Sequence, residues 1–432
     1  MAIETLHLEA ELAKAVGAQH IAAEREGLSV SPSSAEEVAG ILRVANQRRI
    51  RIKLAGAGTK QDWFNPVDAD LLLRTTRMNT VREHAAQDLT AIVDAGCTWG
   101  EMQRQLAGQG QCVALDPLWP ERATIGGIVA ANDSGTLRLR YGSLRDLIIG
   151  MTIVLADGTV ARSGGKVVKN VAGYDMHKLL TGAAGTLGVI TQVNFRLHPV
   201  ERLTRSLTVA SPDIPLLANL MHAVRGSQMM VNAMQLRVGA DDSDAAANAL
   251  DIMFAAGTEC IEDQVKWLER SASPLPANEA AADVWLARQR TFDGASGHDL
   301  GGDHASEFVF KMSVLPLDIA RLVSRLQAAS ASAGLRCPCV AQATGLVTAS
   351  LAGDAEICVE VIREVRAEVE ASSGSIVILR APGDSAPNNG GQPHHKLDRW
   401  GTPGDALPVM RRIKLALDPN GILNPGCFIG GI

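Results

Sequence analysis

The spacing of apolar and polar residues divides the chain into alternating strands and helices. Residues 189–197 alternate between the two classes, with Val189, Val193, Phe195 and Leu197 in phase and polar residues between them. A period of two residues is typical of a strand that buries one face. The His198-Pro199 step interrupts the pattern, and we expect the first domain to end there.

Two pairs of residues at capping-box spacing predict helix starts. Ser33 as N-cap with Glu36 predicts a helix to about Arg48, and Thr98 with Glu101 predicts a helix that ends near 108–110. The other elements predicted in this part are strands at 51–55, 71–74 and 89–94, a short helix from Ile125 capped by Thr124, a helix to Leu180 capped by Asp175, and a hairpin between 147–155 and 159–161 around Asp157-Gly158.

From about residue 205 the pattern changes to strands and helices without glycine-rich loops. Strands are predicted at 206–210, 230–238, 307–314, 339–343 and 376–379, and helices at 214–224, 279–289, 318–330 and 355–371. This alternation is compatible with a ferredoxin-like α+β domain, an antiparallel sheet with helices on one face. Residues 381–403 are rich in Pro, Gly and Asn and predict a loop, and an amphipathic helix is expected at 406–417.

Composition places the chain among globular proteins and excludes some partners. Hydrophobic residues make up 46% of the 432 residues and charged residues 20%. A net charge of −6 without a dense basic run argues against binding to nucleic acid. The longest apolar run, 147–156, is too short to span a membrane, and the acidic N-terminal stretch does not resemble a signal peptide. We therefore expect a cytoplasmic protein that reaches the inner membrane only through partners.

The seven cysteines do not predict a disulfide framework or a metal centre. They are scattered and odd in number, and Cys337 and Cys339 form the only close pair. An iron–sulfur cluster needs four thiolates in a recognisable spacing, which this chain lacks. We expect no bound metal.

Three glycine-rich stretches are the strongest indication of a ligand. They are 56–60 (GAGTK), which follows a predicted strand, 115–142 and 181–191 (TGAAGTLGVIT). Small residues allow backbone to approach a flat or anionic ligand, and a helix that begins at Ile125 with free N–H groups would suit a phosphate. A Rossmann motif is excluded because Gln61 replaces its third glycine and no helix follows directly.

Together the three stretches resemble the vanillyl-alcohol oxidase type (PCMH type) of FAD-binding domain. The resemblance covers about 30–199 and the C-terminal tail. Residues 164–191 and the tail 418–432 (DPNGILNPGCFIGGI) are most similar to the FAD-binding subunits of bacterial glycolate oxidases. The resemblance to the family implies an α+β fold with a two-subdomain FAD-binding domain at 1–199, a ferredoxin-like cap domain at 200–385, and a segment at 386–432 that returns to the FAD domain.

The resemblance also implies which residues contact FAD. The loop 56–60 would wrap the pyrophosphate, the stretch 120–142 would line the isoalloxazine and ribityl chain, and 188–190 would contact the adenine side. We expect the backbone at Gly126, Gly127 and Gly188 to lie against the cofactor. The implied residues are Gly56, Ala57, Gly58, Thr59, Lys60, Pro120, Thr124, Ile125, Gly126, Gly127, Ala130, Asn132, Ser134, Gly135, Tyr141, Gly142, Gly185, Gly188, Val189 and Ile190.

Covalent members of the family attach FAD through a histidine or cysteine in these stretches. This chain has Ala57 in the first loop and neither residue type at 115–142, so we expect FAD to be bound non-covalently.

The resemblance implies oxidation of a small 2-hydroxy acid, and three interpretations remain open. The first is the FAD-binding subunit of a glycolate oxidase, which works with a second flavin subunit and an iron–sulfur subunit. The second is a stand-alone dehydrogenase of D-2-hydroxy acids, and the third is a structural subunit without flavin. No metal-binding histidine motif is visible; Lys311, Arg380, His394 and His395 are the open candidates for substrate contacts.

Overall fold

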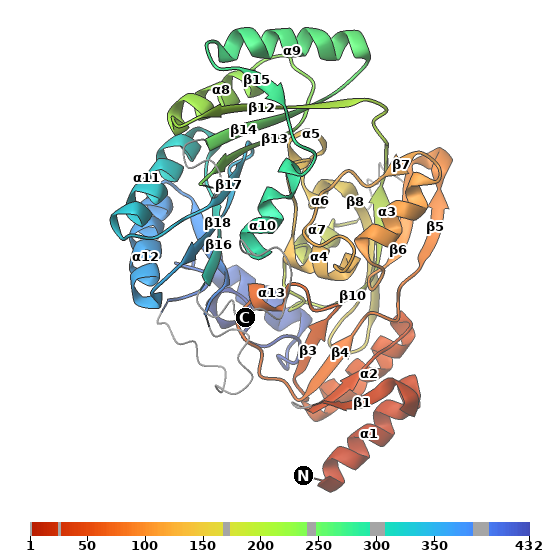
Figure 1. Ribbon diagram of the computed structural model, residues 1–432. Coiled ribbons are helices and arrows are strands. Elements are labelled where there is room, and N and C mark those ends of the chain that lie inside the picture. The colour runs from red at the N-terminus through yellow and green to blue at the C-terminus, as the bar shows by residue number, and fades with distance from the viewer. Residues whose placement is uncertain (1, 25–26, 167–172, 240–247, 294–306, 383–396) are drawn as a thin grey trace. The chain divides into compact units, whose positions relative to one another are not determined.

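The computed structural model describes residues 2–24, 27–166, 173–239, 248–293, 307–382 and 397–432 (Figure 1). The chain forms two compact units. The first contains Met1–Ser134, Gly142–Val200 and Pro403–Ile432, and the second contains Gly135–Tyr141 and Glu201–Thr402. The units therefore divide the chain after Val200 and Thr402, whereas the sequence places domain boundaries after 199 and 385.

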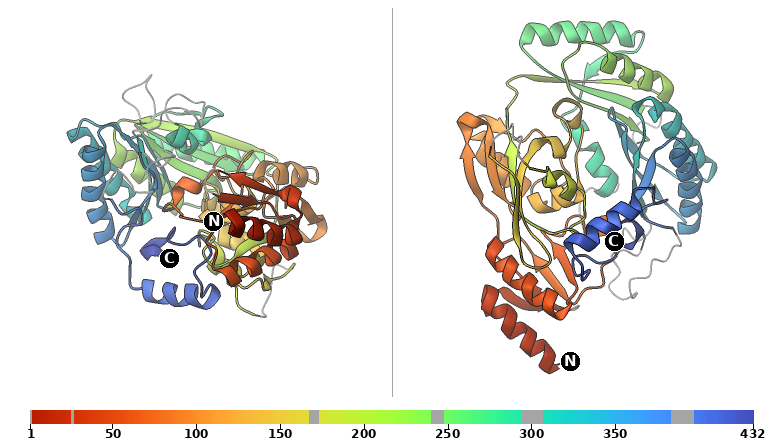
Figure 2. Two further views of the ribbon diagram at one scale, coloured as in Figure 1. Left: turned by 90° about the horizontal axis from the view of Figure 1, so that it is seen from below. Right: turned by 180° about the vertical axis from the view of Figure 1, so that it is seen from behind.

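One sheet of the first unit contains three parallel strands. Its strands run in the order β1 (Ile21–Glu24), β2 (Gly27–Val30), β4 (Leu71–Arg74) and β3 (Ile52–Ala55), with β4 parallel to both β2 and β3. Helix α2 (Ala35–Arg48) buries its apolar face in this subdomain, and α1 (Ala2–Val16) packs beside it (Figure 2). The predicted cap of α2 is wrong by one residue: Ser34 accepts from the Glu37 N–H, because serine and glutamate also occur at capping spacing one position later.

The second sheet of the first unit is antiparallel. Its order is β5 (Val81–Ala85), β6 (Thr90–Asp94), β10 (Val189–Arg196), β8 (Ile148–Val154) and β9 (Val160–Gly164). Val189, Val193 and Phe195 are buried, as the alternation predicts. The remaining elements are the 3-10 helices η1 (Ala18–His20), η2 (Gln61–Trp63) and η3 (Ala86–Asp88), helices α3 (Trp99–Ala107), α4 (Ile125–Ala131), α6 (Leu144–Leu147) and α7 (Met176–Leu180), and the paired short strands β7 (Gln111–Cys112) and β11 (His198–Pro199).

The prediction that the Asp175 side chain caps α7 is also wrong. Asp175 precedes the helix but makes no capping hydrogen bond, since its carboxylate binds Lys178 instead. The hydroxyl of Ser163 on β9 accepts from the His177 N–H at 3.2 Å and takes that role. A residue from a neighbouring strand thus accepts a hydrogen bond from a backbone N–H in the first turn of the helix.

The C-terminal tail belongs to the first unit. It contains α13 (Leu407–Leu417), close to its predicted bounds, and the 3-10 helix η6 (Ile429–Gly431). Leu423 bridges to Ile52 in parallel, at the free edge of β3.

The second unit is one eight-stranded sheet with antiparallel pairing throughout. The order is β15 (Ala277–Glu279), β12 (Thr204–Ser211), β14 (Asn248–Ala255), β13 (Val231–Val238), β17 (Cys339–Gln342), β18 (Leu346–Ala352), β16 (Glu307–Ser313) and β19 (Ser375–Arg380). Figure 1 shows α8 (Ile214–Gly226), α9 (Thr258–Ala272), α11 (Ile319–Ser332) and α12 (Ala355–Ala371) flanking it, with α10 (Ala287–Asp293) against β17 and β18.

Two predictions for the second unit need correction. A helix at 279–289 is wrong, because Ala277–Glu279 forms edge strand β15, and a turn and the 3-10 helix η4 (Val284–Leu286) lead from it into α10. Residues 135–141 pack in the second unit, where α5 (Arg138–Tyr141) contacts β13 and Leu139 joins the apolar core. The 3-10 helix η5 (Pro316–Asp318) precedes α11.

None of the helices in the described ranges is long and apolar enough to cross a membrane.

Candidate functional site

The first unit contains a pocket whose wall comes from five parts of the chain. These are the end of β3 with the stretch after it, the residue after β4, helix α4 with its cap, the turn before β10 with the first residues of β10, and one residue of the tail. The lining residues are Leu54, Ala55, Gly56, Ala57, Gly58, Thr59, Lys60, Gln61, Phe64, Thr75, Thr124, Gly126, Gly127, Ala130, Ala184, Gly185, Gly188, Val189, Ile190 and Asn424.

The loop after β3 presents unused hydrogen-bond donors to this pocket. Within the described residues, the N–H groups of 56–59 have no hydrogen-bond partner. Gly58 has a φ angle of 80°, and a side chain there would meet no atom within 4 Å. Consecutive free N–H groups at such a turn form an anion-binding concavity. This loop can therefore bind a phosphate or pyrophosphate through its backbone.

Helix α4 is capped as predicted but does not offer free donors. Thr124 accepts from the Gly127 N–H, while the N–H groups of Ile125 and Gly126 donate to the carbonyls of Cys97 and Ala95 at 2.9 and 2.7 Å. The expectation of a phosphate at this helix start is therefore wrong, since carbonyls of the chain already occupy its first N–H groups.

Neighbouring protein atoms leave little room for a side chain at Gly126 of α4 and at Gly188, which precedes β10. A Cβ on Gly126 would lie 3.0 Å from the Ala95 Cβ, and one on Gly188 would lie 3.3 Å from the Val154 carbonyl oxygen. A larger residue at Gly126 would push against Ala95 and displace α4 rather than project into the pocket. Its effect on a ligand would be indirect.

Lys60 is held inside the protein by an acidic partner. Its ammonium lies 3.4 Å from the Asp133 carboxylate and donates to the Leu118 carbonyl at 3.3 Å, and both charged side chains are almost fully buried. The rings of Trp63 and Trp119 lie 5.4 and 5.2 Å from this ammonium. Asp133 therefore neutralises the cation, and the backbone supplies the anion-binding groups of the loop.

The turn before β10 is tied to α4 and to the tail. Ala184 donates its N–H to the Ala130 carbonyl at 3.0 Å, and the Asn424 side chain donates to the Ala184 carbonyl at 2.7 Å. Asn424 also accepts from the Leu54 N–H at 2.7 Å. Asn424 of the tail thus connects the end of β3 to the turn before β10, two segments that line the pocket.

The structure brings most of the expected site residues together. Those that line the pocket are Gly56, Ala57, Gly58, Thr59, Lys60, Thr124, Gly126, Gly127, Ala130, Gly185, Gly188, Val189 and Ile190. Those outside its wall are Pro120, Ile125, Asn132, Ser134, Gly135, Tyr141 and Gly142. The lining residues that the sequence did not predict are Leu54, Ala55, Gln61, Phe64, Thr75, Ala184 and Asn424. The NPG turn at 424–426 was a visible signal for Asn424, but only as a break in the chain.

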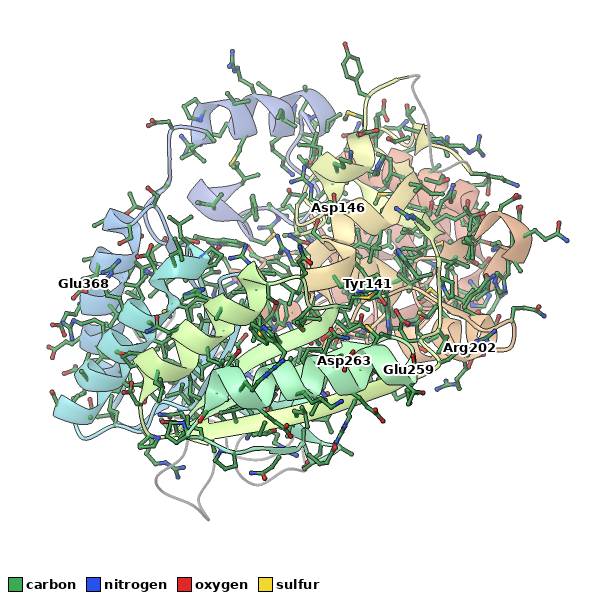
Figure 3. The ribbon with its side chains drawn as sticks, turned by 90° about the horizontal axis from the view of Figure 1, so that it is seen from above. Tyr141, Asp146, Arg202, Glu259, Asp263 and Glu368 are labelled. Carbon is green, nitrogen blue, oxygen red and sulfur yellow. The ribbon has the colours of Figure 1, made fainter. Side chains whose placement is uncertain are left out.

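Tyr141, labelled in Figure 3, has a partner in the second unit. Its hydroxyl donates to the Glu201 carboxylate at 2.8 Å. Burial raises the pKa of Tyr141, and the bond to Glu201 raises it further, so the phenol stays protonated. Asp146 forms a capping box with Ser143 at the start of α6, where its carboxylate accepts from the Ser143 N–H at 2.8 Å. The residues directly after Tyr141 therefore serve to begin a helix.

The second unit carries polar residues on the sheet face opposite its main core. Asp251 is fully buried there and accepts from Thr208, Gln235 and Arg237, with 2.7 Å to the arginine Nε. Gln235 also donates to the Val284 carbonyl at 2.7 Å, which fixes η4 against this face.

The candidates Lys311 and Arg380 lie on this same face. Val309 pairs with Arg380 across β16 and β19, and Lys311 is two positions beyond Val309, so all three point the same way. Phe308 and Phe310 lie on the other face, in the helix-covered core. Arg380 donates to the Phe292 carbonyl of α10 at 2.7 Å. His394 and His395 lie outside the described residues.

No metal-binding cluster of His, Cys, Asp and Glu occurs among the residues that the structure describes. Cys337 and Cys339 are buried, and desolvation raises the pKa of the Cys339 thiol to about 12 and that of Cys337 well above its ordinary value. Both thiols are therefore protonated and behave as core side chains.

Comparisons with known proteins find two family matches along the chain. The family described as FAD binding domain matches residues 28–164, and the C-terminal domain of FAD linked oxidases matches 227–427. A mitochondrial cytochrome-type D-lactate dehydrogenase of Arabidopsis thaliana is 28% identical over 93% of this chain and 73% of its own length. The glycolate oxidase subunit GlcD of Bacillus subtilis is 34% identical over 43% of this chain, and the match spans only 40% of that protein.

Solved structures share the fold at low identity. p-Cresol methylhydroxylase with substrate bound matches with a TM-score of 0.73, over 98% of this chain and 96% of its own, at 15% identity. Such a likeness indicates the arrangement of the elements alone.

Proposed function

The chain is an FAD-dependent oxidoreductase with the vanillyl-alcohol oxidase type of fold, and from this premise we propose that it oxidises a small 2-hydroxy acid. The names of its relatives support the substrate class, since one is a dehydrogenase of D-lactate and another a subunit of glycolate oxidase. Both compounds carry a hydroxyl next to a carboxylate.

We propose that the pocket of the first unit binds the cofactor. The free N–H groups of 56–59 suit the two phosphates of FAD, and the observation that carries the proposal is that the same pocket is lined by the small residues Gly126, Gly127, Ala130, Ala184, Gly185 and Gly188. Bound FAD would supply the acceptor for the electrons that leave the substrate C–H bond. The chain would position the cofactor and exclude water from it.

We propose that Lys311 and Arg380 bind the carboxylate of the substrate. They are cations on adjacent strands of one sheet face, and Phe292 holds the Arg380 guanidinium by a hydrogen bond and by ring contact at 5.7 Å. A fixed guanidinium binds a carboxylate through paired hydrogen bonds. Loss of either cation should raise KM for the acid more than it lowers kcat.

As the specific role we propose the FAD-binding subunit of a glycolate-oxidising complex. In this role the chain would work with a second flavin subunit and pass electrons to an iron–sulfur subunit. The similarity to GlcD and the sequence of the tail support it. Helix α13 has no buried residue, and Val409, Met410 and Leu415 are exposed on it, which would suit contact with a partner subunit.

A stand-alone D-lactate-like dehydrogenase is the second candidate. It is favoured by the extent of the Arabidopsis match, which runs over 93% of this chain. The two roles differ in what the purified chain can do alone. In the complex, glycolate turnover with an artificial electron acceptor should require the partner subunits, whereas rapid turnover of D-lactate by the FAD-loaded chain alone would establish the second role and contradict the first.

A further inference from the structure

Asn424 joins two walls of the cofactor pocket from a position close to the C-terminus. Its amide oxygen accepts from the Leu54 N–H at 2.7 Å, at the end of β3, and its amide nitrogen donates to the Ala184 carbonyl at 2.7 Å. Both bonds use the side chain, and the residue is 8% exposed. One side chain thus connects the strand before the 56–60 loop to the turn that precedes β10.

The backbone of the tail is fixed to β3 at the same place. The Ile52 N–H donates to the Ile422 carbonyl at 2.7 Å, and the Asn424 N–H donates to the Ile52 carbonyl at 2.9 Å. Ile422 and Leu423 are fully buried in the core of this subdomain. The tail therefore adds a short parallel segment to the edge of the sheet, and Asn424 projects from it with a φ angle of 41°, which asparagine tolerates.

Lys414 of α13 makes a second connection to the same turn. Its ammonium donates to the Thr186 carbonyl at 2.8 Å, the Leu423 carbonyl at 2.8 Å and the Asp418 carboxylate at 2.6 Å. Asp418 in turn accepts from the N–H groups of Ile422 and Leu423 at 3.0 and 2.8 Å. All three ammonium protons are used, so the position of α13 is coupled to the position of the turn at 184–188.

Gly185 accommodates this arrangement. Its φ angle is 71°, and a Cβ there would lie 2.9 Å from the Asn424 amide nitrogen. The turn is therefore shaped to receive the tail as well as to line the pocket. Since both walls contact Asn424, its two hydrogen bonds set the distance between them.

We propose that Asn424 and Lys414 are positioning residues of the FAD site, and that the tail 414–427 acts as a clasp whose docking sets the width of the pocket. Neither residue needs to touch the substrate. The proposal depends on the binding of FAD by this chain and not on the identity of the hydroxy acid. FAD binding and tail docking should consequently stabilise one another.

The first test measures FAD affinity. The apo chain is titrated with FAD for the wild type, Asn424→Ala, Asn424→Asp and Asn420→Ala, and the melting temperature of each apo chain is recorded. Asn420 is the matched control, because it lies in the same tail and its side chain bonds Asn46, with no other partner among the described residues. We expect at least a tenfold rise in Kd for both Asn424 variants and less than a twofold change for Asn420→Ala.

Asn424→Asp separates the two bonds of the clasp. The aspartate keeps an acceptor for the Leu54 N–H but places an oxygen against the Ala184 carbonyl, so it should bind FAD no better than Asn424→Ala. A changed visible circular dichroism of bound FAD would mark altered positioning rather than a general loss of stability. Folded Asn424 variants with wild-type Kd and spectrum would overturn the proposal.

The second test needs no variant. Limited proteolysis of the wild-type chain should cut the exposed stretch 402–406 at least tenfold more slowly when FAD is bound, because the ligand favours the docked tail. Equal cleavage rates with and without FAD would refute the clasp even if the Asn424 variants fail to fold.

Discussion

At the scale of single residues, a comparison of Gly58 with Gly110 distinguishes a glycine needed for ligand binding from a glycine needed only for the backbone conformation. Both have positive φ angles, 80° and 67°, and a side chain at either would meet no atom within 4 Å. Gly58 lines the pocket, whereas Gly110 follows α3 and does not. Any L-residue at these positions is strained by about 1 to 2 kcal/mol. A difference between the two substitutions therefore reports on the ligand.

Gly58→Ala should weaken FAD binding and Gly110→Ala should not. Both substitutions lower stability by a similar amount through the same backbone strain, but only the first disturbs the free N–H groups of 56–59. Titration of the two apo chains with FAD measures the difference. Equal FAD affinity for both variants would place the pyrophosphate elsewhere.

The mode of cofactor attachment is also decided by single residues. The described residues that line the pocket include no histidine, cysteine or tyrosine. FAD should therefore be released when the purified protein is precipitated with acid, and the flavin should be recovered in the supernatant. A yellow precipitate that retains flavin after washing would demonstrate a covalent bond.

Residue-level prediction from the sequence succeeds where a rule is local. The Thr124 cap of α4 follows from a threonine before a run of small residues, and the structure has it. The free N–H groups expected beside it are absent, because carbonyls of Ala95 and Cys97 occupy them. These acceptors lie in a distant turn, and no local pattern around Ile125 reveals them.

At the scale of elements, the second unit depends on a charge buried within its sheet. Asp251 of β14 is fully buried, and its partner Arg237 on β13 is 13% exposed. Removal of one member of such a pair leaves the other charged and poorly solvated. The pair is therefore a point where a single substitution should destabilise the sheet.

Asp251→Asn should lower the free energy of unfolding by about 3 kcal/mol. Asp263→Asn is the control: Asp263, labelled in Figure 3, pairs with Lys266 on the exposed side of α9, and its side chain is 80% exposed. Denaturant unfolding followed by circular dichroism compares the two variants. Similar stabilities would mean that Arg237 finds other partners when the carboxylate is lost.

The bounds of helices and strands could be predicted where the pattern of apolar residues was clear, and less well at the edge of the sheet. Helix α12 has the predicted bounds because its apolar residues recur at helical spacing, and β4 has them because it is a short run of leucines that ends at Arg74. The stretch 279–289 contains helix-favouring residues, yet Glu279 pairs with Leu207 at the edge of the sheet. Edge pairing is a tertiary contact, and it overrides local propensity.

At the scale of the whole molecule, the resemblance located the cofactor loops better than any local pattern. The loops at 56–60 and 185–190 meet at one pocket although they are far apart in the sequence. The contribution of Asn424 could not be predicted, because it depends on where the tail docks and on a side chain that bonds two loops at once. The local helix and strand propensities of residues describe neither the docking of the tail nor the two bonds of this side chain.

We propose that the flavin of this chain accepts electrons from a small 2-hydroxy acid. Anaerobic mixing of the FAD-loaded protein, alone and with its partner subunits, with glycolate or D-lactate tests this directly while the absorbance of oxidised flavin is followed. We expect bleaching with a hydroxy acid and none with acetate or propionate, which lack the hydroxyl. Flavin that stays oxidised with every 2-hydroxy acid, in the chain alone and in the complex, yet is reduced by dithionite, would contradict it.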